Sequence, residues 1–401
     1  MERAYEFRIY PNAAQREQIE RTFGCCRWVY NRCLEVKRAE FCAAGKSSSV
    51  YELQKLIPVW KKSGAAWLSG ADSTALQSSV VDLGRAYDNF FRRVKRGGKP
   101  GLPKFKSKRG ARQSYRSKRV GDNIAVLDGK HVRLPKLGAV RARVSRPVEG
   151  RVLSATVKRV PSGKYFVVLC CTDCPEPAME PGPVDVMGVD VGVRCLMARS
   201  DGAAVENPRS LKGAERRLAR EQRRLSRKRK GSANRAKQKR RVATAHERVV
   251  DRRKDALHKA TTDAVRESQA IAVEKLDVRG MLANAGENRR VPRRVERRVH
   301  AAMTDAAMGE MLRQLSYKAG WYGRGFVEVD PALTSETCSD CGAVREMPLT
   351  VRVYRCGSCG LSLDRDVNAA RNIARIGRKR LEGTVGHTGT GAKAPTLVET
   401  A

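Results

Sequence analysis

Two Cys-x-x-Cys pairs near the end of the chain constrain its folding more than any other feature of the sequence. Cys338 and Cys341 form the first pair, Cys356 and Cys359 form the second, and 14 residues separate the pairs. Four thiolates at this spacing can close tetrahedrally around Zn²⁺ and leave no open coordination position. The pattern therefore predicts a structural zinc ribbon, in preference to four free thiols or a disulfide pair.

Positive charge is the second constraint. The 401 residues include 81 Lys and Arg against 42 Asp and Glu, a formal net charge of +39. Residues 92–119 hold 13 basic and no acidic residues, and residues 209–241 hold 16 basic and two acidic ones. A surplus of this size repels itself unless a polyanion binds. Neither stretch has the apolar face that membrane-surface binding requires, so nucleic acid is the expected partner and a membrane is not.

The N-terminus and the apolar runs predict where the protein works. No run approaches the ~18 consecutive apolar residues of a membrane span. The first ten residues lack the apolar segment of a secretory signal. We therefore expect a cytoplasmic protein, in which cysteines stay reduced unless they bind metal.

The first 180 residues predict a small antiparallel barrel with a helical insertion. A strand at 3–10 and helices over 12–44 and 49–94, broken near residues 64–70, precede a Gly- and Pro-rich basic loop at 95–112. Short alternating runs then predict strands, which the strand at 3–10 joins. These runs are 123–127, 131–134, 139–144, 151–159 and 165–171.

After a linker at about 175–183, strands alternate with helices, which is typical of an α/β domain. The expected strands are 184–193, 195–199, 270–274 and 325–330. One long basic helical region is expected from 208 to 267, a basic loop at 281–300, and helices at 301–319 and 366–378. The tail, residues 381–401, has no periodicity and is expected to be disordered.

Three carboxylates stand where burial makes them costly without a partner. Asp190 lies in the apolar segment Val-Met-Gly-Val-Asp-Val-Gly, and Glu274 ends the apolar run Ala-Ile-Ala-Val-Glu. Asp366 begins a helix directly after the cysteine pairs, and Asp364 is its rival. Neighbouring strand ends and a helix N-terminus can bring three carboxylates together, and Mg²⁺, as one or two ions, suits such an oxygen-rich site. Each carboxylate alone could instead be a turn residue, an ion-pair partner or a helix cap.

These residues resemble a known family. The sequence resembles the TnpB (OrfB) family of insertion-sequence-encoded RNA-guided nucleases, which are related to type V CRISPR effectors. The resemblance spans about residues 3–378. The motifs that carry it are Gly188-Val-Asp190-Val-Gly192, Val273-Glu274-Lys-Leu, the double Cys-x-x-Cys, Asp364-Arg-Asp366-Val-Asn368-Ala-Ala-Arg-Asn372-Ile, Arg313-Gln-Leu-Ser-Tyr-Lys318 and Gly101-Leu-Pro-Lys-Phe-Lys106.

The resemblance implies a domain plan that combines α+β and α/β parts. Residues 1–11 and 113–180 would form a wedge β-barrel, and 12–112 a helical recognition lobe with a basic loop. Residues 184–330 and 364–380 would form a RuvC (RNase H-like) nuclease domain. Residues 331–363 would form the inserted zinc ribbon. The match favours Asp366 over Asp364, so Asp190, Glu274 and Asp366 would be the catalytic, Mg²⁺-binding triad.

The resemblance also implies a function. The protein would bind one guide RNA as a monomer and cleave complementary double-stranded DNA beside a short adjacent motif. It would work in a bacterium or archaeon and be associated with the nucleoid through DNA. Three alternatives stay open: a nuclease-silent RNA-guided repressor, a DNA-joining transposase and a compact type V CRISPR effector. Twelve basic residues are candidates for nucleic-acid contact, namely Arg92, Arg93, Lys95, Arg96, Lys104, Lys106, Arg227, Lys228, Arg229, Lys230, Arg240 and Arg241.

Overall fold

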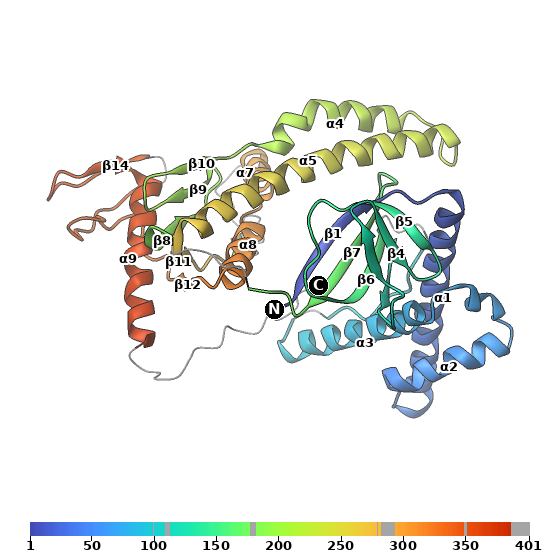
Figure 1. Ribbon diagram of the computed structural model, residues 1–401. Helices are drawn as coiled ribbons and strands as arrows, with labels where there is room; N and C mark the ends of the chain where they lie inside the picture. The colour runs from blue at the N-terminus through green and yellow to red at the C-terminus, as the bar shows by residue number, and fades with distance from the viewer. Residues whose placement is uncertain are drawn as a thin grey trace. The chain divides into compact units, whose positions relative to one another are not determined.

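The computed structural model describes residues 1–98, 100–108, 113–176, 182–278, 280–281, 293–348 and 351–385. The chain divides into two compact units, Met1–Pro175 and Glu176–Ala401, and each is described by itself (Figure 1). None of the helices in the described part of the chain is long and apolar enough to cross a membrane.

A seven-stranded antiparallel sheet forms the centre of the N-terminal unit. Its order is β2-β6-β7-β1-β5-β4-β3. The first strand of the chain joins the later strands, as the sequence predicts, and lies between β7 and β5. Strands β2 and β3 are the two edges of the described sheet and do not pair, so the expected barrel is not closed by hydrogen bonds. The strands are β1 (Arg3–Ile9), β2 (Gln113–Lys118), β3 (Ala125–Asp128), β4 (His131–Leu134), β5 (Gly138–Arg143), β6 (Arg151–Arg159) and β7 (Tyr165–Thr172).

Strand β2 is the element of this sheet that the sequence did not reveal. It lies inside the basic segment, where Arg and Lys outnumber the apolar residues that mark a strand. Tyr115 and Ser117 nevertheless alternate inward and are buried, because β6 supplies a full antiparallel ladder beside them. Pairing with β6 therefore outweighs the weak local pattern.

The helices of this unit are α1 (Ala13–Ala44), α2 (Val50–Lys62), a 3₁₀ turn η1 (Ala66–Gly70) and α3 (Ser73–Lys95). Asn12 caps α1 in a reciprocal capping box with Gln15, and Ser49 does the same for α2 with Glu52. The face of α1 that recurs at helical spacing, including Ile19, is buried in the core. These helices confirm the predicted helical segments and the break near residues 64–70.

The C-terminal unit is built on a five-stranded sheet of order β10-β9-β8-β11-β12. Its strands are β8 (Val184–Asp190), β9 (Cys195–Arg199), β10 (Ala204–Glu206), β11 (Ser268–Glu274) and β12 (Gly325–Val329). The strands β8, β11 and β12 are parallel to one another, whereas β9 and β10 run antiparallel to their neighbours. The sheet confirms the α/β pattern of the sequence.

Helices cover both faces of this sheet (Figure 1). Met187, Val189 and Ile271 point to the face covered by α5, α7 and α8, whereas Val186 and Ala272 point to the face covered by α9. The helices are α4 (Ser210–Ser226), α5 (Ala233–Arg266), α7 (Arg293–Ala306), α8 (Met308–Trp321) and α9 (Arg365–Val385). A small hairpin, β13 (Val353–Arg355) with β14 (Ser362–Asp364), precedes α9.

The single helical region predicted from 208 to 267 is wrong in one respect, because it is a hairpin of two helices. Gly231 takes a φ of +86° at the turn, and Ser232 caps α5. The Arg235 guanidinium donates to the carbonyls of Leu225 and Lys228, which closes the turn. In the interior, Gln238 donates to the Glu221 carboxylate at 2.7 Å and joins the two helices.

Three further boundaries differ from the expectation. Part of the loop expected at 281–300 is helical, since α7 begins at Arg293, and residues 282–292 lie outside the described residues. Ala307, with a φ of +51°, separates α7 from α8, where one helix was expected. Helix α9 continues to Val385, so the first five residues of the expected disordered tail are helical. Leu381 packs with the cluster on the sheet and extends the helix, whereas residues 386–401 lie outside the described residues.

Gly188 lets α9 approach the sheet. A Cβ at this position of β8 would lie 1.9 Å from the carbonyl oxygen of Ala370 and 2.6 Å from the amide nitrogen of Ala374, both in α9. Real Cβ atoms do not come this close to backbone atoms, so any other residue would push α9 away. The first turn of α9 therefore reaches the end of β8 because position 188 has no side chain.

We expect Gly188→Ala to destabilise the C-terminal unit by about 3 kcal/mol, because the helix and the strand must separate. Gly213→Ala is the matched control, since a Cβ in α4 would meet nothing within 4 Å. That change should stabilise the unit by about 0.5–1 kcal/mol. Hydrogen exchange of the β8 and β11 amides measures both effects, and equal protection in the two variants would refute the close contact.

Candidate active site

Asp190 and Glu274 end two neighbouring parallel strands. Val189 pairs with Val273 across β8 and β11, so the two acids that follow stand at the same level. Residues two apart on a strand share a face, which puts Asp190 with Gly188, and Glu274 with Ala272, on the side that α9 covers. The register of the sheet thus brings together two of the three predicted carboxylates.

Asp366 lies in the first turn of α9, and the Arg194 guanidinium joins it to Asp364, the other candidate for the third carboxylate. Arg194 donates to Asp364 at 2.7 Å and to Asp366 at 3.1 Å. Asp364 also accepts the backbone N–H of Asp366 at 2.8 Å, so one of its oxygens caps the helix. The Asp366 side chain is 17% exposed and that of Asp364 is 36% exposed. Asp364 is therefore partly committed to the fold, and Asp366 is the more buried acid.

The site concentrates carboxylates whose pKa values are raised. Burial, together with repulsion from the neighbouring Glu274 and Asp366 carboxylates, raises the pKa of Asp190 to about 7. Burial also raises the pKa of Glu274, against a hydrogen bond from Thr334 that lowers it. Acids that repel one another in a buried place are suited to a divalent cation, because its charge removes the repulsion.

The carboxylate oxygens do not form a closed cluster by themselves. In the described part of the chain, only the four ribbon cysteines bring three or more candidate ligand atoms within 4.8 Å of one another. The three acids approach from two strand ends and one helix, and Arg194 holds Asp366 through its guanidinium. The donor set fits Mg²⁺ in chemistry, since all its atoms are carboxylate oxygens.

Glu274 is held by a chain of hydrogen bonds that the sequence did not reveal. The Thr334 hydroxyl donates to Glu274 Oε1 at 2.6 Å. Asn372 of α9 donates in turn to the backbone carbonyls of Thr334 and Thr337, at 2.9 and 2.7 Å. Asn368, one turn earlier, donates to the carbonyl of Thr337 at 2.8 Å. The spacing of the two asparagines on one helix face was the available signal, whereas nothing local marks Thr334.

We expect Thr334→Val to slow the cleavage reaction proposed below by roughly tenfold, because a hydrogen bond to a charged group contributes about 1.5–3 kcal/mol. Thr334→Ser keeps the hydroxyl and should stay within about threefold of the wild type. Single-turnover rates over a Mg²⁺ titration measure the effect. Equal rates for the valine and serine variants would show that the hydroxyl does not position Glu274.

The four cysteines of the predicted ribbon converge. Cys338 Sγ lies 3.7 Å from Cys359 Sγ, and Cys341 Sγ lies 3.5 Å from Cys356 Sγ. Tetrahedral zinc with bonds of about 2.3 Å separates its sulfurs by about 3.8 Å, which these distances approach. None of the four forms a disulfide. Backbone N–H groups of Cys359 and Ser358 lower the pKa of Cys356 to about 6, whereas the pKa of Cys359 in the same cluster is raised to about 12, so Cys356 is the first of this pair to become a thiolate.

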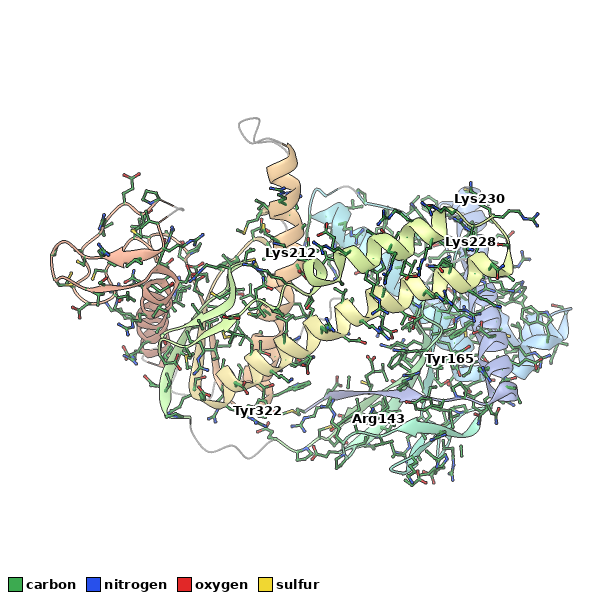
Figure 2. The ribbon with its side chains drawn as sticks, turned by 90° about the horizontal axis from the view of Figure 1, so that it is seen from above. Arg143, Tyr165, Lys212, Lys228, Lys230 and Tyr322 are labelled. Carbon is green, nitrogen blue, oxygen red and sulfur yellow. The ribbon has the colours of Figure 1, made fainter. Side chains whose placement is uncertain are left out.

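The predicted nucleic-acid residues fall into three places. Arg92, Arg93, Lys95 and Arg96 are exposed at the C-terminal end of α3, and Lys104 is exposed in the loop that follows. The turn from Arg227 to Lys230 is exposed at the tip of the α4–α5 hairpin, where Figure 2 labels Lys228 and Lys230. Arg240 and Arg241 are exposed on α5.

Lys106 differs from the other candidates. Its ammonium lies 4.0 Å from the centre of the Tyr30 ring, and burial lowers its pKa. Its backbone N–H donates to the Asn31 side chain at 2.8 Å, and its carbonyl accepts from the same amide at 3.0 Å. Lys106 therefore anchors the basic loop to α1.

Three family models match parts of the chain. Residues 169–285 match OrfB_IS605, described as "Probable transposase", and residues 309–373 match the Cas12f1-like TNB domain. Residues 1–46 match a helix-turn-helix domain of the same OrfB family, although here they form β1 and the one long helix α1. The second match contains all four ribbon cysteines and Asp366.

Relatives match the chain over nearly its whole length. A Streptomyces pristinaespiralis protein named "Putative RNA-guided DNA endonuclease" is 37% identical to this chain, over 94% of this chain and 90% of its own length. InsQ of Escherichia coli K12, named in the same way, is 35% identical over 93% and 92%. A solved Cas12f1–sgRNA–target DNA complex has a similar fold, with a TM-score of 0.54, 15% identity and coverage of 93% and 98%. The identities of 37% and 35% to these two bacterial relatives, over at least 90% of each chain, establish that the chain belongs to the TnpB (OrfB/IS605) family.

Proposed function

We propose that this protein is an RNA-guided DNA endonuclease whose reaction is the hydrolysis of a phosphodiester bond at Asp190, Glu274 and Asp366. The observation that carries the proposal is the level arrangement of Asp190 and Glu274 on one face of neighbouring parallel strands, beneath the helix that carries Asp366. Acids so placed are costly to bury, and the fold nevertheless keeps both at the C-terminal ends of its central strands. Residues 184–330 and 364–380 would then be a RuvC-type, RNase H-like domain.

The three carboxylates would hold Mg²⁺, as one or two ions. Bound there, Mg²⁺ would lower the pKa of an attacking water and stabilise the leaving oxygen of the phosphodiester. The chain's own residues have separate tasks. Thr334 orients the Glu274 carboxylate by its 2.6 Å hydrogen bond, and Gly188 admits the helix that carries Asp366. Arg194 forms ion pairs with Asp364 and Asp366 and so offsets part of their negative charge.

The remaining parts would divide the recognition of RNA and DNA. The seven-stranded sheet would be the wedge and the helices at 12–112 the recognition lobe, while residues 331–363 would be the zinc ribbon that supports Glu274. The exposed basic residues of α3 and of the α4–α5 hairpin would bind phosphates of a guide RNA and of the guide–target duplex. The names of the bacterial relatives and the RNA and DNA in the solved complex support this partner class.

Co-purification followed by cleavage tests the proposal. The protein is expressed with its native flanking DNA, bound RNA is sequenced, and a plasmid library with a randomised adjacent motif is offered in Mg²⁺. A discrete RNA with guide-dependent linearisation, at one RNA per protein monomer, is the expected result. Binding without cutting would replace the proposal with an occupancy repressor, and joined products would replace it with a transposase. A repeat array beside the gene would instead indicate a compact CRISPR effector.

A further inference from the structure

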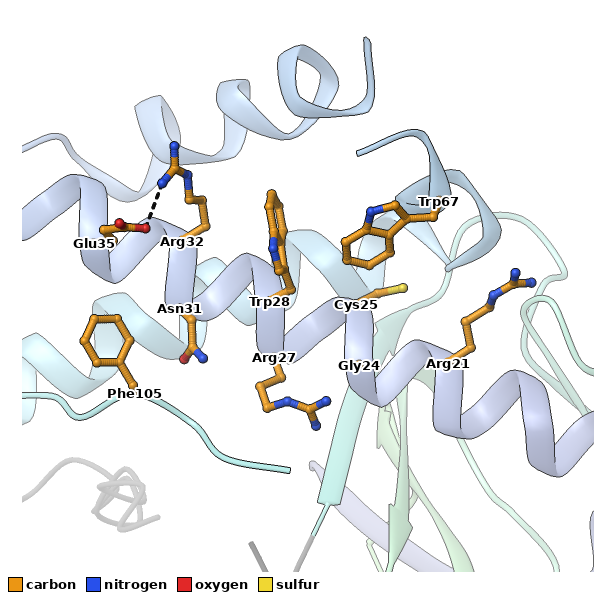
Figure 3. Close-up of a pocket in the computed structure, with 10 residues that line it drawn as sticks. All are labelled: Arg21, Gly24, Cys25, Arg27, Trp28, Asn31, Arg32, Glu35, Trp67 and Phe105. Atoms are coloured by element: carbon orange, nitrogen blue, oxygen red, sulfur yellow. Dashed lines mark hydrogen bonds and ion pairs between the residues drawn. The ribbon is translucent and has the colours of Figure 1, made fainter. Parts of the chain in front are cut away.

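A groove runs along one face of α1 in the N-terminal unit, and none of the twelve basic residues predicted from charge lines it. Its volume is about 480 Å³, and it is lined by α1, by Trp67 of η1 and by Phe105 of the basic loop. Figure 3 shows Arg21, Trp28 and Arg32 along one side of the helix. These residues follow a helical spacing, and at 1.5 Å per residue the stripe from Arg21 to Arg32 is about 16 Å long.

The groove presents rigid aromatic rings. Trp28 packs edge-on between Trp60 and Trp67, with ring centroids 5.5 and 5.4 Å apart. Trp67 nevertheless stays 45% exposed and Phe105 52% exposed. The Arg38 guanidinium lies 5.0 Å from the Phe105 ring, and the loop that carries Phe105 is tied to α1 by Asn31. The exposed rings are thus held in place without being covered.

The same groove is positively charged. Arg21 makes no hydrogen bond or ion pair with any other residue that the structure describes. Among the residues that the structure describes, the Arg27 side chain has one hydrogen-bond partner, the Gln113 side chain at 3.4 Å, whereas Arg32 pairs with Glu35 at 2.8 Å. Arg21 and Arg27 are therefore available to an anionic ligand, whereas Arg32 already neutralises Glu35.

We propose that this groove binds a short run of unpaired nucleotides, with bases stacked on Trp67 and Phe105 and phosphates on Arg21 and Arg27. Fixed, exposed ring faces beside guanidinium groups are the chemistry that holds single strands. A base within a duplex has both faces covered by its neighbours, so a duplex cannot use the rings. The inference rests on the proposed function only for its partner class, because binding here needs neither cleavage nor a matching guide.

The test uses the full-length protein and fluorescein-labelled oligonucleotides, either a uridine or a thymidine homopolymer of equal length. Anisotropy is measured in salt high enough to screen the general basic surface. We expect Trp67→Ala and Phe105→Ala each to weaken binding about tenfold. An abasic strand keeps the phosphates but has no bases, so it should bind more weakly and be insensitive to both changes. A preference for uridine over thymidine strands, or the reverse, separates an RNA source from a DNA source.

Matched controls keep the result specific. Phe41→Ala removes an aromatic side chain that is 62% exposed on the same helix outside the groove, and should leave affinity unchanged. Arg21→Ala should weaken binding more than Arg16→Ala, although both remove one charge from α1. Phe105→Ala lies in a loop that Asn31 still anchors, so it tests the site even if Trp67→Ala unfolds. Equal binding of the base-bearing and abasic strands, unchanged by Phe105→Ala, would overturn the proposal.

The outcome is separate from that of the proposed function. Asp190→Ala should keep full affinity for the oligonucleotides, since Asp190 belongs to the other unit. If the wild-type protein cleaves DNA but shows no base-dependent binding of the oligonucleotides, the groove proposal alone is refuted. Base-dependent binding without cleavage in any wild-type preparation would refute the nuclease alone.

Discussion

Asp190→Asn is expected to abolish DNA cleavage and, at the same time, to raise the melting temperature of the metal-free protein. Removal of a carboxylate that binds catalytic Mg²⁺ costs several kcal/mol, so the rate should fall roughly a thousandfold or more. Affinity for guide RNA should not change, because Asp190 lies at a strand end and not on the basic surfaces. The combination of lost activity and gained stability distinguishes a functional carboxylate from a structural one.

The stability gain follows from the pKa of Asp190. Its folded pKa of about 7 lies above its ordinary value of 3.8, mainly because of burial. The folded protein therefore binds this proton more tightly than the unfolded chain does, and the native state loses stability as the pH rises from about 4 to about 7. At about 1.4 kcal/mol per pH unit, the full loss is about 4 kcal/mol above pH 7, and the asparagine variant avoids up to that amount.

Thermal unfolding at pH 5 and pH 8 without Mg²⁺ measures this effect. The difference between Asp190→Asn and wild type should be larger at pH 8 than at pH 5. Asp185→Asn is the control, since Asp185 is an exposed acid of the same strand that pairs with Arg378 at 3.0 Å. It should change stability by less than about 1 kcal/mol and leave cleavage intact. A destabilised Asp190→Asn at pH 8 would show that the buried carboxylate supports the fold.

Cys356→Ser is expected to release zinc and to unfold the ribbon. Structural zinc contributes about 10–16 kcal/mol in small zinc domains, and three thiolates hold it far less tightly than four. The core of the ribbon cannot replace the metal, because its buried cluster consists of Met347, Tyr354 and two of the cysteines themselves. Zinc content per chain and hydrogen exchange over residues 338–359 measure the loss.

The loss of zinc should also reach the acidic site. Ser339 donates its backbone N–H to Asn368, and Asn372 holds Thr334, whose hydroxyl binds Glu274. An unfolded ribbon frees this segment, so cleavage should fall by at least about tenfold. Cys42→Ser, at an exposed cysteine of α1, should change neither zinc content nor cleavage. Full cleavage by a zinc-free Cys356→Ser protein would show that the ribbon does not support Glu274.

The elements that the sequence predicted well are those with a strong local pattern. Tyr5, Phe7 and Ile9 alternate and form a strand, and the apolar runs that end in Asp190 and Glu274 form parallel neighbours. Boundaries failed where tertiary contacts override the pattern. Strand β2 forms because β6 pairs with it, and the helix expected to end near 378 continues because Leu381 packs on the sheet.

The sequence by itself determined the four-cysteine cluster, the surplus of positive charge and the carboxylates at apolar strand ends. Spacing, composition and period-2 alternation are properties of short segments, so no fold is needed to read them. Only the tertiary structure decided that β8 and β11 are adjacent in register, that Thr334 holds Glu274 across 60 residues, and that Trp67 and Phe105 line one groove along α1. These contacts join residues far apart in the chain, and long-range packing, which no local pattern encodes, brings them together.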